Sequence, residues 1–156
     1  MRLTGYLARK EDDVMLFIPM VGVVPCSGEE IPEGTVTRIA ARIVLEELRP
    51  TQTMTICLPL YLAGGKEERD FVRRQPIIIV DGCEKGCAEK SIRKHNGNVA
   101  AVIRIPEVMK ECELQAKNRV KLDDKGEELA RRVAERIATE VDRILEEMKR
   151  KSMEEE

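Results

Sequence analysis

The sequence has few aromatic residues and no excess of positive charge. Its 156 residues include no Trp, two Phe, two Tyr and one His. Proteins that stack nucleic-acid bases need aromatic platforms, so this scarcity argues against that class. The 27 basic and 29 acidic residues give a net charge of -2. Because both signs are interspersed, there is no basic stripe for a phosphate backbone. We therefore expect no nucleic-acid partner.

Long apolar runs are also missing from the sequence. No stretch reaches the roughly 20 apolar residues that a membrane-spanning helix needs. Residues 1–13 lack the apolar core of a secretion signal. We therefore expect a cytoplasmic protein without a membrane partner. In that compartment, the five cysteines are more typical of free thiols or metal ligands than of a disulfide framework.

One stretch, from Pro76 to Cys87, organises the chain. The β-branched run up to Val80 is typical of a strand buried on both faces, as in a parallel sheet. Asp81-Gly82 is a turn signal, and residues 84–95 are rich in helix formers. Gly97 stands where a glycine often ends a helix. This reading puts Cys83 and Cys87 one helical turn apart, so their sulfurs can share a face.

Similar patterns predict the other elements. We expect further strands at Val14–Val24, Thr53–Leu58 and Val99–Ile105. Pro19 lacks an amide donor, so either the first strand is confined to Met20–Val24 or Pro19 marks a bulge or turn. Residues 61–65 are predicted to form a loop, and residues 106–121 fit no single assignment. The predicted helices run from Thr35 or Thr37 to Leu48, from Lys66 to Arg74, and from Asp124, which with Glu127 resembles a capping box.

Strands that alternate with helices predict an α/β fold with a mostly parallel sheet. We expect one Rossmann-like domain over residues 1–156: a three-layer open sheet of about four strands in the order 2-1-3-4, with helices on both faces. Residues 1–13 and 149–156 are expected to be loose. The apolar stripe of the C-terminal helix is expected to cover the sheet. Its alternative use is to pair with a second copy and form a homodimer.

Four cysteines share a position in this predicted topology. Cys26 follows the first strand, Cys57 ends the second, Cys83 follows the third, and Cys87 lies on the next helix. Because parallel strands bring their carboxyl ends to one edge, we expect the four sulfurs to converge there. Cys112 lies outside the pattern and is expected to be a small core residue.

Several chemistries suit such a cluster. Four thiolates suit zinc in a closed tetrahedral site, and helix N-terminal amides with Lys85 would offset the negative charge. The same surroundings suit thiol redox or sulfur-carrier chemistry at Cys83 and Cys87, or an iron–sulfur cluster. Asp81 either shapes the turn or serves as a general acid/base or a support for the thiolates. His95 is expected to interact with the helix end rather than bind metal.

The cysteine pattern also carries a resemblance. Asp81-Gly82-Cys83 followed by Cys87-Ala88, with Cys26-Ser27-Gly28 upstream and Cys57 at a strand end, resembles the DGC-domain family. That family is named for its Asp-Gly-Cys motif and is described by four chelating cysteines. The resemblance implies zinc binding, with Cys26, Cys57, Cys83 and Cys87 in the four cysteine places. It supplies no substrate. The loop after Cys26 carries Glu29, Glu30 and Pro32, where the family pattern leads us to expect small residues.

Overall fold

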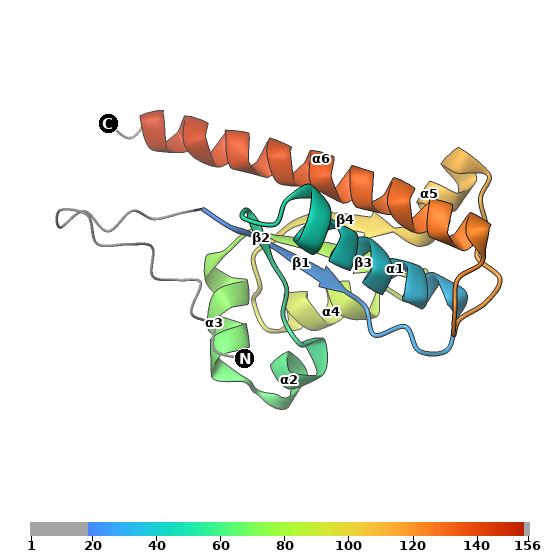
Figure 1. Ribbon diagram of the computed structural model, residues 1–156. Coiled ribbons are helices and arrows are strands. Elements are labelled where there is room, and N and C mark those ends of the chain that lie inside the picture. Colours follow the sequence, from blue (N-terminus) through green and yellow to red (C-terminus); the bar gives the residue numbers. More distant parts are fainter. Residues whose placement is uncertain (1–18, 155–156) are drawn as a thin grey trace.

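The computed structural model describes residues 19–154 as a four-stranded parallel sheet with helices on both faces (Figure 1). The sheet order is β2-β1-β3-β4, and every neighbouring pair is parallel. This confirms the predicted open α/β fold and its strand order. The strands are β1 (Val21–Pro25), β2 (Thr53–Met54), β3 (Ile77–Asp81) and β4 (Val99–Arg104).

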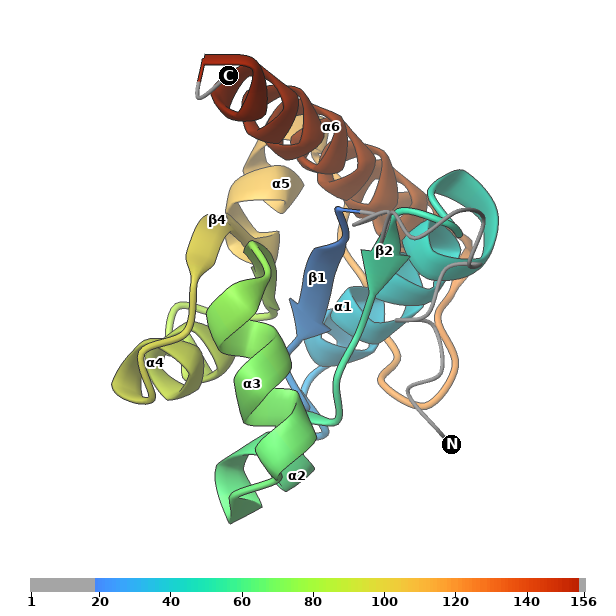
Figure 2. The same cartoon turned by 90° about the vertical axis from the view of Figure 1, so that its left-hand side faces the viewer.

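Helices cover both faces of the sheet (Figures 1 and 2), and an apolar layer lies between the helices and the sheet on each face. One layer contains side chains of α1 (Pro32–Ile43), α5 (Ile105–Cys112) and α6 (Asp124–Glu154); the other contains side chains of α2 (Leu58–Ala63), α3 (Lys66–Arg74) and α4 (Cys87–Lys94). Successive strand side chains point to opposite faces. Ile78 and Val80 therefore join the first layer, whereas Ile77 and Ile79 join the second. All four are fully buried, as expected for a central parallel strand.

β1 agrees within one residue with the shorter predicted range, Met20–Val24, whereas the second strand is shorter than predicted. β1 begins at Val21, and residues 14–18 of the predicted strand lie outside the described residues. β2 covers only Thr53–Met54, so the predicted strand to Leu58 is wrong. Val21 donates its amide to Gln52 of the β2 side, whereas Gly22 and Cys26 donate toward β3. The nitrogens of residues 21, 23 and 25 in β1 thus face β2. The last of these belongs to Pro25, which has no hydrogen to donate. The ladder ends there.

Local backbone signals explain other differences in the helices. The predicted loop at 61–65 is wrong for residues 61–63, which belong to α2; this helix ends at Gly64, whose φ is +102°. α1 begins at Pro32 rather than at a threonine cap, because proline suits the first helical position. A π-helical segment, η2 (Val44–Leu48), continues it. The predicted helix from residue 84 starts only at Cys87, after Gly86 with φ +61°.

The C-terminal helix α6 extends from Asp124 to Glu154, so residues 149–154 are helical, and the looseness expected of residues 149–156 stays a prediction. Its capping side chain is Asp123, whose Oδ1 accepts the Gly126 amide at 3.1 Å, rather than Asp124. Ten residues of α6 are buried, and eight of them join the first layer, which is the predicted use of its stripe. Across residues 19–154, no helix combines the length and apolarity that crossing a membrane requires.

Strand β4, at one end of the sheet, contains an irregularity. Ile77 pairs with Val99, but Ile78 pairs with Ala101, so Ala100 is skipped. A β-bulge of this kind inserts one residue and bends the strand. The regular part of β4 is therefore Ala101 to Arg104.

Candidate functional site

Cys26 lies where the carboxyl ends of two neighbouring strands meet. Its amide donates to the Val80 carbonyl of β3 at 2.9 Å. Its Sγ atom is buried, with the residue 7% exposed, and accepts the amide of Gly82 at 3.3 Å. Gly82 follows β3 directly. The sulfur therefore joins the turn after β1 to the turn after β3, as the predicted strand order requires.

Thr37, on the second turn of α1, is the other polar neighbour of this sulfur. Its Oγ1 lies 3.7 Å from the Cys26 Sγ. The hydroxyl also donates to the Gly34 carbonyl at 2.7 Å and lies 3.4 Å from the Cys26 carbonyl oxygen. Thr37 is fully buried. The sequence indicated this residue only as a helix cap, because its sulfur contact depends on how the loop before α1 folds back.

Glycines allow that loop to fold back tightly. A Cβ added to Gly34 would collide with the Gly28 carbonyl oxygen, and Gly28 itself has φ +48°. A Cβ on Gly82 would lie 3.0 Å from the Gly34 nitrogen. Backbone therefore packs directly on backbone around Cys26. Glu29, Glu30 and Pro32, where the family pattern led us to expect small residues, lie between Gly28 and Gly34.

The surroundings of Cys26 act on its acidity in opposite directions. Burial raises the pKa of its thiol above the ordinary value, and this effect is the largest. The hydrogen bonds from Gly82 and Thr37 lower the pKa, while the charges of Asp81 and Cys83 raise it. The net effect is an increase. In the metal-free protein, Cys26 therefore carries its proton at neutral pH.

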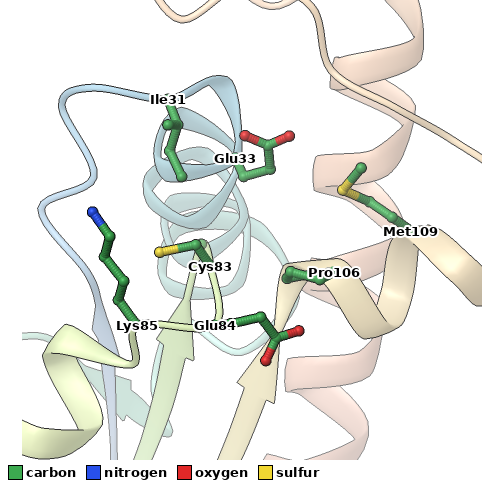
Figure 3. A pocket seen from close by; sticks show the side chains of 8 residues that line it. Ile31, Glu33, Cys83, Glu84, Lys85, Pro106 and Met109 are labelled. Atoms are coloured by element: carbon green, nitrogen blue, oxygen red, sulfur yellow. The ribbon is translucent and has the colours of Figure 1, made fainter.

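Cys83 is half-buried and opens onto a pocket of about 420 Å³. Figure 3 shows the start of α1 facing the Cys83 turn across this space, with α5 closing one side. Cys83 follows Gly82, whose amide donates to the Cys26 sulfur, so these two cysteines share one corner of the site. The pocket is lined by Ile31, Glu33, Gly82, Cys83, Glu84, Lys85, Pro106 and Met109.

Cys57 and Cys87 lie at the same edge of the sheet but are exposed. Cys57 comes just before α2, and Cys87 is the first residue of α4. Gly86, which has a left-handed conformation, separates Cys83 from α4. Cys83 and Cys87 therefore do not share a helical face, contrary to the prediction. Within residues 19–154, no three His, Cys, Asp or Glu side chains are grouped closely enough to hold a metal ion. The convergence of all four sulfurs stays a prediction.

Asp81, the last residue of β3, lies buried next to the site. It is 1% exposed, and its two carboxylate oxygens accept the amides of Ala88 and Glu89 at 3.0 and 3.1 Å. These amides belong to the first turn of α4, where no helical carbonyl is within reach. Asp81 therefore ties β3 to α4, and both its oxygens are engaged. Asp81 thus has a structural role, which is to accept hydrogen bonds from the first turn of α4.

Cys112 and His95 lie away from this corner. Cys112 is half-buried at the end of α5, against the first apolar layer. His95 follows the eight residues of α4, so about 12 Å of helix separate it from Cys87. Its ring makes an edge contact with Tyr61, with centroids 5.7 Å apart. Desolvation, followed by the charges of Arg69, Lys94 and Arg73, lowers the pKa of His95, which favours the neutral imidazole.

The structure is an open parallel α/β domain with Cys26 and Cys83 in turns at the carboxyl edge of its sheet. A family model for the DGC domain matches residues 22–148. The chain therefore belongs to the DGC domain family, as the Asp81-Gly82-Cys83 motif indicated. Comparisons with curated proteins and with solved structures found no match.

Proposed function

We propose that this DGC domain binds zinc through Cys26, Cys57, Cys83 and Cys87. The observation that carries the proposal is the position of the Cys26 sulfur, which accepts the Gly82 amide in the corner that Cys83 shares. Thiolates are the ligands that zinc prefers in closed structural sites. An amide donor to a ligating sulfur offsets part of the negative charge that such a site accumulates.

The donor set fits zinc by its chemistry. Cys26 is held in place by the backbone, whereas Cys57, Cys83 and Cys87 lie in a turn or at helix starts and are at least partly exposed. Exposed side chains at such positions can turn toward a fixed ligand at small cost in packing. Bound zinc would supply a link between the carboxyl ends of the strands. Each thiol must lose its proton on binding, and for Cys26 this proton is the one that burial stabilises.

Metal analysis of the protein purified under reducing, air-free conditions tests the proposal. We expect about one zinc per chain. Cys83→Ser should lower the zinc content sharply. Cys112→Ser is the matched control and should leave it unchanged, because Cys112 packs against the first apolar layer. Equal losses from both substitutions would show that the wrong four cysteines were chosen. A visible absorption band with bound iron would instead indicate an iron–sulfur cluster.

Thiol redox chemistry is the second candidate function. The observation that favours it is that Cys83 is accessible beside Cys26, while no three ligands are grouped in the described residues. Hydrogen peroxide would oxidise Cys83 and a neighbouring thiol to a disulfide, and two electrons and two protons would reduce the peroxide to water. Rapid alkylation of Cys83 below pH 7, unaffected by added zinc, would support this candidate and contradict zinc binding.

A further inference from the structure

The buried hydroxyl of Thr37 has two kinds of neighbour. It donates to the Gly34 carbonyl at 2.7 Å, which is a common back-bond of threonine within a helix. Its other neighbours are the Cys26 carbonyl oxygen, at 3.4 Å, and the Cys26 sulfur, at 3.7 Å. A hydroxyl has one hydrogen and two lone pairs. While the hydrogen points to Gly34, a lone pair can accept the S–H of protonated Cys26.

A metal-bound Cys26 would be a thiolate, so the contacts of its sulfur would have to be hydrogen-bond donors. A thiolate has no hydrogen to give and needs donors instead. The Gly82 amide already donates to the sulfur at 3.3 Å. A rotation about the Thr37 Cβ–Oγ1 axis brings a second donor to it without moving the backbone. Thr37 is fully buried, so water cannot take over this task.

We propose that Thr37 is a positioning residue of the cysteine site: its hydroxyl and the Gly82 amide fix the Cys26 sulfur and stabilise it as a metal ligand. The inference rests on the proposed zinc binding. It makes Cys26 the ligand whose sulfur is already held in position before the metal binds. The side chains of the other three cysteines would turn toward the metal when it binds. If the Thr37 hydroxyl served only as a hydrogen-bond donor to the Gly34 carbonyl, its removal would leave the metal affinity unchanged.

Substitution of Thr37 separates these two roles. Thr37→Val keeps the side-chain shape and removes the hydroxyl, and Thr37→Ser restores the hydroxyl. Thr53→Val is the matched control, because Thr53 is also buried and donates to a carbonyl, that of Arg49, at 2.7 Å. Zinc affinity, measured by competition with a chromogenic chelator, should fall about 10- to 100-fold in Thr37→Val. It should be largely restored in Thr37→Ser and unchanged in Thr53→Val.

A second measurement needs no metal. The infrared S–H stretch of reduced, metal-free protein reports the hydrogen bond of each thiol, and Cys26→Ser identifies the Cys26 band. This band should shift in Thr37→Val and stay in place in Thr53→Val. A band that does not move would overturn the role of Thr37, whether or not the protein binds zinc. Thermal unfolding of each variant checks that it is folded.

The two proposals fail in different ways. If the wild type takes up neither zinc nor cobalt but the Cys26 band shifts in Thr37→Val, zinc binding is wrong and Thr37 still positions the sulfur. If the wild type binds zinc and Thr37→Val binds it equally well, the positioning role is wrong and zinc binding stands. Equal weakening in Thr37→Val and Thr53→Val would mean a general loss of stability, which also overturns the role of Thr37.

Discussion

Replacing Asp81 by Ala should remove the link between β3 and the start of α4. The carboxylate is 1% exposed and accepts the amides of Ala88 and Glu89 at 3.0 and 3.1 Å. Alanine offers neither amide a partner, and the first turn of α4 is left with two more unsatisfied donors. The first residue of that turn is Cys87, so the change also loosens one of the proposed ligands.

The magnitude follows from the two hydrogen bonds. Each bond to a charged acceptor contributes about 1.5–3 kcal/mol, and loss of a capping side chain costs about 0.5–2 kcal/mol in measured cases. Part of this is offset because a charge no longer has to be buried. We expect the free energy of unfolding to fall by about 2–4 kcal/mol. With a urea dependence of about 2 kcal/mol per molar, the unfolding midpoint should drop by roughly 1–2 M.

Urea unfolding followed by far-ultraviolet circular dichroism provides the measurement, since the chain has no Trp for fluorescence. Asp81→Asn retains one acceptor oxygen and should lose about half as much stability as Asp81→Ala. Asp123→Ala removes the half-buried cap of α6, which makes one bond of 3.1 Å, and should cost about 1 kcal/mol. An Asp81→Ala loss no larger than that of Asp123→Ala would refute the capping role and reopen a chemical role for this carboxylate.

Three further outcomes are expected. Gly34→Ala should lower the free energy of unfolding by about 1–3 kcal/mol in a urea titration, because its Cβ meets the Gly28 carbonyl; an unchanged midpoint would contradict this packing. Asp142 bonds Arg49 through both oxygens at 2.8 and 2.6 Å, and this hydrogen bonding lowers its pKa. A carboxyl group whose pKa is lower in the folded than in the unfolded protein stabilises the fold at a pH above its unfolded pKa, and this stabilisation is lost as the pH falls through its folded pKa. Asp142→Asn should therefore cost about 0.5–1 kcal/mol near pH 7 and almost nothing near pH 2. A strong chelator should lower the Tm of zinc-loaded protein only modestly, since both apolar layers can fold without metal; complete unfolding on chelation would show otherwise.

The parts of the fold that the sequence predicted well rest on short-range patterns. The run before Asp81 is apolar at every position, which only a strand buried on both faces explains. The stripe of α6 repeats over many turns, so its period is unambiguous. Placing Cys26, Cys57 and Cys83 after successive strands needed only the order of elements and the rule that parallel strands end at one edge.

The remaining features depend on contacts between distant residues. The early end of β2 follows from Pro25, but only once it is known which neighbour the nitrogen of Pro25 faces. Thr37 meets Cys26 because Gly28 and Gly34 pack backbone against backbone, and no local pattern in the sequence announces such a contact. The turn at Gly86 depends on a left-handed glycine where helix formers on both sides favoured a continuous helix. The sequence could therefore place the cysteines at one edge without giving the directions of their side chains.

The bulge at Ala100 bears on how this protein avoids self-aggregation. β4 is the last strand of the described sheet, and its apolar composition would otherwise make it a template for a foreign strand. The skipped residue leaves only Ala101 to Arg104 in regular register. Arg104, at the end of that run, forms an ion pair with Glu89 of α4, so a charged pair lies at the end of the strand. An incoming strand thus meets a short ladder with a kink at one end and charge at the other, so the edge is a poor nucleus for fibrils.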